Sequence, residues 1–339
     1  MKITIFSPSG VILEGKRLRL AVKRLQQLGV EVSVDSAAKL RTQRFAGSDQ
    51  ARLEAIMRVA QDDSDVALAS RGGYGLTRLL DVIDWKRIAQ SVEQGKHWVG
   101  HSDFTVFQLA LLAHTGACSW AGPMALADFG QADGSEPDEI TSACFMEAVS
   151  GELEAVGFRT EKGFDGLSAH GVLWGGNLSM VCSLLATRHW PQIEGGILFL
   201  EDVNERPYRV ERMLLQLHQA GVLSRQKAIL LGDFGKWEPT SIDKGYRLTH
   251  AVQYLRTICD TPILTGLPFG HITTKLTLPV GKPVELAVDR REVFLHWGHQ
   301  HTDAHGHGQE QAEPVDPRAL EDEETGGCCG GHCTHHLLR

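Results

Sequence analysis

The stretch Lys96–Ala113, KHWVGHSDFTVFQLALLA, contains an apolar strand-like run, a sharp corner and an apolar helix-like run in immediate succession. The first run ends at Gly100. Apolar side chains then recur on both faces of the segment that follows: Phe104, Val106, Phe107, Leu109, Leu111 and Leu112. This pattern predicts a helix that is buried nearly all round. A strand that leads directly into such a helix is typical of an α/β fold.

Ser102 occupies the corner between the expected strand and the expected helix, where a side chain projects from the fold. The first amide groups of the helix and the positive end of its dipole point back toward this residue. A hydroxyl group in that position is suited to nucleophilic attack, because the amides would hold an oxyanion. Serine is also a leading N-cap residue, so a capping role stays open. The G-x-S-x-G pattern is not met, since Phe104 replaces its second glycine.

Strands and helices alternate on both sides of this corner. We expect strands over residues 2–6, 30–34, 65–69, 97–100 and 120–124, and helices over 18–28, 49–60 and 140–149. Alternation at this spacing predicts a parallel sheet that is covered by helices on both faces.

A glycine-rich loop, Ser70–Gly75, follows the third expected strand. Its three glycines allow the backbone to approach a ligand at the carboxyl edge of the sheet, where ligands of open parallel sheets bind. The same edge receives Ser102, so we expect the loop and the serine to face each other. The loop matches neither of the two common nucleotide-binding motifs, and a plain tight turn is the alternative.

Composition changes to Gly, Glu and Lys near residue 150, which predicts a linker over 151–168 between a domain of residues 1–150 and one of residues 169–298. The second domain is expected to be mixed α/β with a β-rich end. We predict strands over 171–174, 196–200, 228–231 and 262–265, helices over 178–187, 207–220 and 245–257, a turn at 175–177, and small antiparallel strands over 275–297.

Two polar positions of the second domain qualify for chemistry. Glu201 follows an almost wholly apolar strand, so it is either held inside, where it would orient an imidazole, or exposed at a strand end. His271 lies in a Gly-Pro loop, where a neutral imidazole is available as a general base.

Size and charge place the chain among ordinary soluble proteins. It has 339 residues, 42% of them hydrophobic, and no run approaches the 18 apolar residues of a membrane span. The apolar run at the amino terminus is too short for the core of a signal peptide, so we expect a cytoplasmic protein. From residue 301 on, eight acidic residues against two arginines give −6 of the formal −8, which leaves −2 for the body. A nearly neutral body argues against a nucleic-acid partner.

The cysteines fall into two groups. Cys118, Cys144, Cys182 and Cys259 stand singly in apolar surroundings, which predicts buried reduced thiols. The other three belong to an acidic tail over residues 299–339, whose composition predicts disorder. Imidazole and thiol groups of the tail are candidate weak ligands for a divalent metal: His299, His301, His305, His307, Cys328, Cys329, His332, Cys333, His335 and His336. An inert solvated tail is the alternative.

Several short motifs occur in one order along the chain: Ser7–Gly10 (SPSG), Phe45–Asp49 (FAGSD), Arg71–Gly75 (RGGYG), Gly100–Asp103 (GHSD), Trp174–Leu178 (WGGNL), Phe199–Asp202 (FLED), Pro207–Arg209 (PYR) and Gly270–His271. Together they resemble the LD-carboxypeptidase family of serine peptidases, which includes murein tetrapeptide LD-carboxypeptidases and microcin immunity peptidases. The resemblance covers about residues 3–298. It departs from the family at His101, where an aromatic residue such as Tyr is usual.

The resemblance implies a fold, a site and a dimer. The first domain would be flavodoxin-like or glutamine-amidotransferase-like, and the second a β-rich swivelling domain, with the site between them. It implies Ser102 as nucleophile, His271 as base and Glu201 as the carboxylate that orients the base. The backbone amides of Gly73 and Asp103 would form the oxyanion hole. It further suggests a homodimer.

The chemistry that follows needs neither a metal nor an organic cofactor, because Ser102, His271 and Glu201 would hydrolyse an amide through an acyl-enzyme. By resemblance, the substrate is a murein tetrapeptide, which loses its terminal D-alanine during peptidoglycan recycling. Candidate substrate-binding residues are Arg71, Asn177 and Arg209, although backbone amides would also bind a free carboxylate. The alternatives are a microcin-immunity-type peptidase that acts on aminoacyl nucleotide analogues and a metal-handling protein that acts through its tail.

Overall fold

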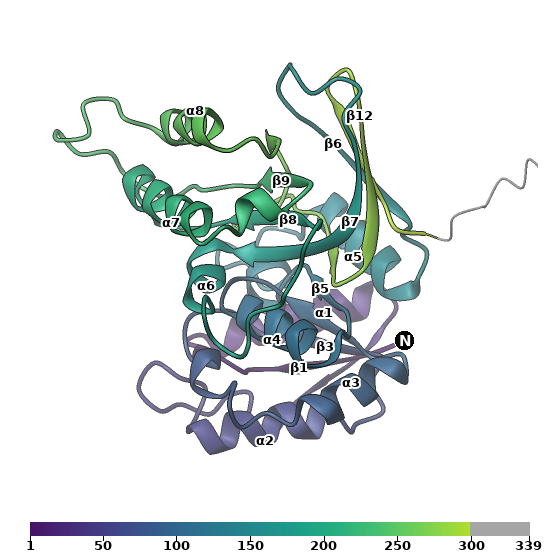
Figure 1. Cartoon of the computed structure of the whole chain (residues 1–339). Helices are drawn as coiled ribbons and strands as arrows, with labels where there is room; N and C mark the ends of the chain where they lie inside the picture. The colour runs from purple at the N-terminus through teal and green to yellow at the C-terminus, as the bar shows by residue number, and fades with distance from the viewer. Residues whose placement is uncertain (299–339) are drawn as a thin grey trace, which may run out of the picture. The chain divides into compact units, whose positions relative to one another are not determined.

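The structure, a computed structural model, describes residues 1–298, which are built on two β-sheets (Figure 1). The first sheet has the strand order β11-β5-β4-β3-β1-β2. Its bounds are β1 Lys2–Phe6, β2 Glu31–Val34, β3 Val66–Ala69, β4 His97–Gly100, β5 Ser119–Ala121 and β11 Leu278–Val280. Strands β1 to β5 pair in parallel, whereas β11 runs antiparallel to β5. The chain therefore returns to its first sheet after most of the second sheet is complete.

The second sheet is half parallel and half antiparallel, in the order β10-β9-β8-β7-β12-β13-β6. Its bounds are β6 Ala155–Arg159, β7 Ser168–Asn177, β8 Ile197–Glu201, β9 Ala228–Leu231, β10 Ile263–Thr265, β12 Pro283–Asp289 and β13 Glu292–His296. Strands β7 to β10 are parallel, and β12, β13 and β6 complete a meander on the other side of β7. This sheet supplies the β-rich end that the sequence predicts.

Helices cover both sheets. Their bounds are α1 Gly15–Gln27, α2 Asp49–Val59, α3 Trp85–Glu93, α4 Thr105–Thr115, α5 Glu139–Ser150, α6 Leu178–Ser183, α7 Pro207–Gln219 and α8 Leu248–Ile258. Alternate residues of the first sheet enter different apolar clusters, as the two-residue period of a strand requires. In β3, Ala67 and Ala69 join the cluster that contains α2, α3 and α4, whereas Val66 and Leu68 join the one that contains α1 and α5.

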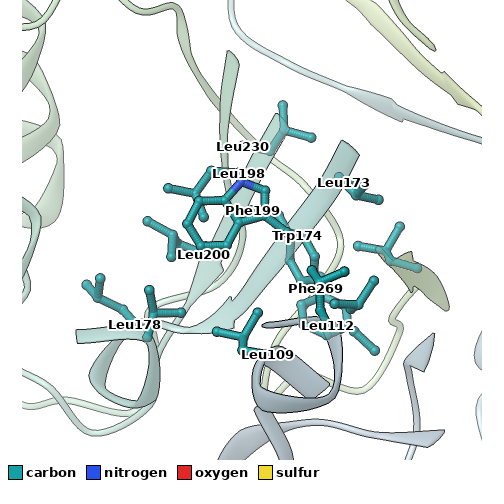
Figure 2. Packing of buried hydrophobic residues seen from close by; sticks show 14 of the residues in the cluster. Leu109, Leu112, Leu173, Trp174, Leu178, Leu198, Phe199, Leu200, Leu230 and Phe269 are labelled. Atoms are coloured by element: carbon teal, nitrogen blue, oxygen red, sulfur yellow. The ribbon is translucent and has the colours of Figure 1, made fainter. Parts of the chain in front are cut away.

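Helix α4 connects the two sheets. Its apolar side chains contribute to the same cluster as β7 and β8, and Figure 2 shows Leu109 and Leu112 beside Trp174 and Phe269. Trp174 and Phe269 are fully buried, and each such side chain stabilises the fold by roughly 1.5–3 kcal/mol. The helix that begins near Ser102 is therefore a shared wall of both layers, which explains why it is apolar all round.

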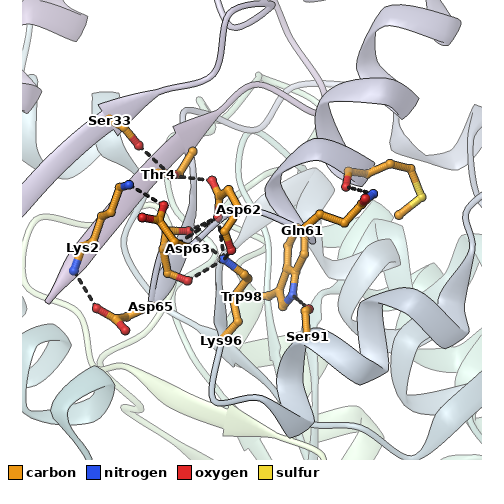
Figure 3. A network of polar contacts seen from close by, with 12 residues as sticks. Lys2, Thr4, Ser33, Gln61, Asp62, Asp63, Asp65, Ser91, Lys96 and Trp98 are labelled. Atoms are coloured by element: carbon orange, nitrogen blue, oxygen red, sulfur yellow. Dashed lines mark hydrogen bonds and ion pairs between the residues drawn. The ribbon is translucent and has the colours of Figure 1, made fainter.

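A polar network closes the amino edge of the first sheet (Figure 3). The buried Lys96 ammonium lies 2.6 Å from the Asp62 carboxylate, which also accepts a hydrogen bond of 2.8 Å from Thr4. Burial alone would raise the pKa of Asp62, but hydrogen bonds from Lys96, Ser64 and Thr4 lower it. This edge is therefore filled by its own side chains (Figure 3), whereas the glycine loop and Ser102 lie at the carboxyl edge, where β3 and β4 end.

Several elements differ from the sequence-based expectations. The segment 151–168, expected to be a linker, contains β6, which pairs with β13. The predicted turn at 175–177 is wrong, because these residues continue β7 and pair with Phe199, Leu200 and Glu201 of β8. The helix predicted over 178–187 ends at Ser183. Helix α3 was not predicted.

The described cysteines and helices bear on two further expectations. Cys118, Cys144, Cys182 and Cys259 are free, as predicted, although Cys118 and Cys182 are only partly buried. None of the helices in the described part of the chain has the length and hydropathy of a membrane-spanning segment.

Candidate active site

Ser102 lies at a strained corner between β4 and α4. A single turn of 3₁₀-helix, Ser102–Phe104, joins the strand to the helix, and Ser102 has a φ of 62°. Few residues other than glycine adopt this left-handed conformation, and where they do, it often marks a functional site. The residue in the cap position is His101, not Ser102. The capping role that the sequence left open is therefore not the one Ser102 takes.

The glycine-rich loop after β3 packs directly against Ser102. A Cβ atom on Gly72 would lie 2.7 Å from both Cβ and Oγ of Ser102 and 3.4 Å from the amide nitrogen of Asp103. Gly73 has a φ of 113°, which favours glycine. The loop and the serine thus face each other, as expected.

Asp103 fastens this arrangement with its side chain. Its Oδ2 accepts a hydrogen bond of 3.0 Å from the amide of Leu76, at the end of the loop. The carboxyl group is buried, and burial raises its pKa. The sequence suggested only a backbone role for Asp103, because a contact across 27 residues leaves no local signal.

His271, which is partly buried, pairs with the buried Glu201 at the end of β8. Nδ1 of His271 lies 2.8 Å from Oε2 of Glu201, whose side chain is fully buried at the end of β8. The backbone at Gly270 approaches Glu201 closely, because a Cβ added to this glycine would lie only 3.2 Å from the same Oε2 atom. Glu201 therefore accepts the Nδ1 proton of a neutral imidazole, which leaves Nε2 as the proton acceptor.

Asn177 holds the carboxylate from the other side. Its Nδ2 donates hydrogen bonds of 3.1 Å to Glu201 Oε1 and 3.0 Å to Asp202 Oδ1. Asp202 also accepts hydrogen bonds from the backbone amides of Ser179 and Val203, and burial raises its pKa. Asn177 is itself buried. The side chain is thus committed to the two carboxylates rather than to the cavity.

Ser102 and His271 line one cavity of about 300 Å³, to which Gly72, Gly73 and Arg71 also contribute. The structure thus brings the predicted nucleophile, the predicted base and the glycine loop to a single space. Glu201 reaches that space through its hydrogen bond to His271.

The comparisons with known proteins identify the family of this fold and site. Models of the LD-carboxypeptidase N-terminal and C-terminal domains match residues 3–122 and 170–286. The chain belongs to the LD-carboxypeptidase family. The predicted family, the α/β fold and the assignment as a carboxypeptidase enzyme are confirmed.

Relatives of this LD-carboxypeptidase are spread over several bacteria. A probable murein peptide carboxypeptidase of Bacillus subtilis (strain 168) is 30% identical over 84% of this chain and 88% of its own length. A murein tetrapeptide carboxypeptidase of Pseudomonas aeruginosa is 29% identical over 85% and 94%. The crystal structure of a muramoyltetrapeptide carboxypeptidase from Oxalobacter formigenes is 40% identical, with a TM-score of 0.80 over 88% of this chain and 99% of that chain. The microcin C7 self-immunity protein MccF is 21% identical, with a TM-score of 0.76 over 87% and 95%, a likeness of fold alone.

The departure from the family at His101 leaves a neutral ring in that position. Its Nδ1 lies 2.8 Å from the carbonyl oxygen of Gly122, and its ring meets that of His271 edge to face at 5.0 Å. Burial, followed by the charges of Lys275 and His271, lowers the pKa of His101 well below its ordinary value. A neutral imidazole thus precedes Ser102 in this LD-carboxypeptidase.

The predicted substrate-binding residues are dispersed. Arg71 lines the cavity beside Ser102 and donates a hydrogen bond of 2.9 Å to the carbonyl oxygen of Val11. Arg209 is exposed on α7 and pairs with Glu205, away from the residues that line this cavity. A cation that the sequence did not single out, Arg17, also lines it.

Metal ligands do not gather in the described part of this LD-carboxypeptidase, where no group of three or more His, Cys, Asp or Glu side chains is arranged to hold an ion. The ten candidate ligands of the tail, from His299 to His336, lie outside the described residues.

Proposed function

We propose that this LD-carboxypeptidase releases the terminal D-alanine of a murein tetrapeptide through a Ser-His-Glu acyl-enzyme mechanism, in peptidoglycan recycling in the cytoplasm. The observation that carries the proposal is that His271, hydrogen-bonded to a buried Glu201, lines the same cavity as the strained Ser102. The names of the relatives supply the substrate class.

The reaction begins with proton transfer from Ser102 Oγ to Nε2 of His271 as the oxygen attacks the carbonyl carbon of the scissile bond. Glu201 stabilises the imidazolium that forms. The backbone amides of Gly73 and Asp103 donate to the tetrahedral oxyanion. This assignment is supported by the close approach of the Gly72 backbone to the amide nitrogen of Asp103.

Collapse of the tetrahedral intermediate completes the first half. His271 gives its proton to the nitrogen of the departing D-alanine, and the acyl group stays on Ser102. Water then enters, loses a proton to His271 and attacks the ester, which frees the tripeptide and restores the serine. A free terminal carboxylate must be recognised as well, and Arg71 and Arg17 are the cations of the cavity that can bind it.

The test is mass spectrometry of a murein tetrapeptide incubated with the protein, with Ser102→Ala and with Ser150→Ala, an exposed serine at the end of α5, as the control. We expect the loss of one alanine with the wild type and the control. The nucleophile variant should be slower by about 10⁶-fold. Addition of a chelator should change nothing. Equal rates for Ser102→Ala and the wild type would contradict the proposal.

An aminoacyl sulfamoyl adenosine belongs in the same assay as a second substrate, since a microcin-type activity is the rival within this family. Trp174, one candidate wall for a base, is fully buried and hydrogen-bonded to Gln226, and no tryptophan of the described residues lines the cavity beside Ser102. Cleavage of this analogue but not of the tetrapeptide would favour it.

Two expectations from the sequence remain predictions. A homodimer should give twice the chain mass of 37.2 kDa in light scattering after size-exclusion chromatography. Weak divalent metal binding by the tail should disappear on truncation after residue 298, without loss of peptidase activity.

A further inference from the structure

A second cavity adjoins the one that contains Ser102, and its wall is strongly cationic. It has a volume of about 350 Å³ and is lined by three arginines, Arg41, Arg44 and Arg71, together with Tyr74. Arg71 and Gly73 line both cavities. The two spaces therefore meet at the glycine loop, beside the nucleophile.

The arginines of this cavity form no ion pair within the described part of the chain. The residues that line the second cavity include no Asp or Glu. None of the ion pairs within residues 1–298 involves Arg41, Arg44 or Arg71. Arg52 and Arg78, which lie on the far side of the same loop, do pair with Asp49. The three arginines that line the second cavity thus have no ion-pair partner within residues 1–298, unlike these two neighbours.

Two of these arginines, Arg71 and Arg44, contact neutral groups. The side chain of Arg71 donates to the carbonyl oxygen of Val11 at 2.9 Å, and the amide of the same Val11 donates to the carbonyl oxygen of Arg44 at 3.0 Å. The Arg44 guanidinium lies over the ring of Tyr74, 5.7 Å from its centre. Carbonyl oxygens and an aromatic ring hold a guanidinium group in position without neutralising its charge.

The close cations disfavour one another in the free protein. Burial, followed by the charges of Arg17 and Arg44, lowers the pKa of the Arg71 guanidinium. A fold does not gain stability from crowding uncompensated positive charges, whereas an anion bound among them would relieve the repulsion. Guanidinium groups bind both carboxylate and phosphate oxygens in bidentate geometry.

We propose that the cavity lined by Arg41, Arg44, Arg71 and Tyr74 is a subsite for an anionic group of the substrate other than the carboxylate at the cleaved end. This inference rests on the proposed function, because it takes the neighbouring cavity as the place of bond cleavage. The group is a carboxylate of the peptide or a phosphate of a carrier attached to it. The subsite then selects polyanionic substrates rather than taking part in the chemical step.

The test compares two tetrapeptides that share the scissile bond and the terminal carboxylate, one with its other carboxyl groups free and one with them amidated. The wild type should prefer the free peptide in kcat/KM by about 10- to 100-fold, the range for one hydrogen-bonded charge pair. Arg44→Gln and Arg41→Gln should lose that preference through KM while kcat stays the same. Arg44→Lys should recover part of it. Arg225→Gln, at an exposed site beyond β8, is the control.

Inorganic pyrophosphate distinguishes the phosphate source. If a phosphate is the natural occupant, pyrophosphate should compete with the peptide for the wild type but not for Arg44→Gln, and amidation should matter little. Calorimetric titration of both probes into Ser102→Ala, with and without Arg44→Gln, measures the subsite apart from turnover. Equal affinities in the two backgrounds would overturn the subsite even for an active enzyme. Absent turnover with intact Arg44-dependent binding would overturn the proposed function alone.

Discussion

Substitution of Gly72 by alanine tests the geometry of the nucleophile most directly. The new Cβ would lie 2.7 Å from both Cβ and Oγ of Ser102, against the 3.4 Å at which ordinary contact begins. One of the two residues must therefore move by about 0.7 Å or more. Gly72 does not have a positive φ, so alanine meets no backbone strain at this position.

The expected effect falls on the rate rather than on the fold. Overpacking of this kind costs typically about 1–3 kcal/mol of stability, and Ser102 borders a cavity into which it can shift. A displacement of about 1 Å in a reacting group costs on the order of 10²-fold in rate. We expect kcat for D-alanine release to fall by about that factor.

The assay is a steady-state measurement of alanine release at pH 7, with the free energy of unfolding measured in urea on the same samples. Gly157→Ala is the matched control, because a Cβ there would meet nothing closer than 3.6 Å. A folded Gly72→Ala enzyme with the wild-type kcat would refute the reasoning, since the nucleophile would then tolerate a shift that the mechanism forbids.

Three other substitutions probe the groups around this centre. Glu201→Gln should lower kcat by about 10⁴-fold, because an amide no longer fixes the Nδ1–H tautomer of His271; single-turnover mass spectrometry measures it, and a change below tenfold would contradict the assigned role. Since burial holds the pKa of His101 well below 6.5, the unfolded chain takes up this proton first, so the stability that His101 contributes is complete above about pH 6.5 and is lost as the pH falls. Urea unfolding between pH 8 and pH 5 should then show a larger loss for the wild type than for His101→Phe, and equal losses would disprove it. Lys275→Met should lower the free energy of unfolding by about 3–5 kcal/mol, because it leaves the buried Asp128 carboxylate without the ammonium group with which it pairs. Addition of Asp128→Asn should restore part of this, and no recovery in urea unfolding would argue against the pair.

The sequence predicted well those features that depend on neighbours along the chain. Strands β1, β4 and β9 have the predicted bounds, because short apolar runs between turn residues need no distant information. The corner at Ser102 also follows from its flanks. The loop that carries Gly72 was recognisable by composition, although its approach to Ser102 to within contact distance was not.

Features that depend on distant partners escaped prediction. Gly175 and Gly176 resemble a turn in the sequence, yet they continue β7. Glycine is needed there because a Cβ on Gly175 would lie 2.0 Å from the carbonyl oxygen of Phe199 in the neighbouring strand. The sequence marked Arg71 but not Arg17, because the helix position of Arg17 looks like any solvated face. Asn177 was taken for a substrate ligand, whereas its amide is occupied by two carboxylates that only the fold brings near.

These same glycines explain how two layers hold one site together. A Cβ on Gly176 would lie 2.5 Å from Oγ1 of Thr105, the first residue of α4, and that hydroxyl accepts a hydrogen bond of 3.0 Å from the amide of Asn177. Helix α4, which starts just after Ser102, is thus hydrogen-bonded to the end of β7. The side chain of Asn177 at that strand end donates a hydrogen bond to Glu201. Because Ser102 and Glu201 are both anchored at this joint, a side chain at Gly176 would push apart the two layers that carry them.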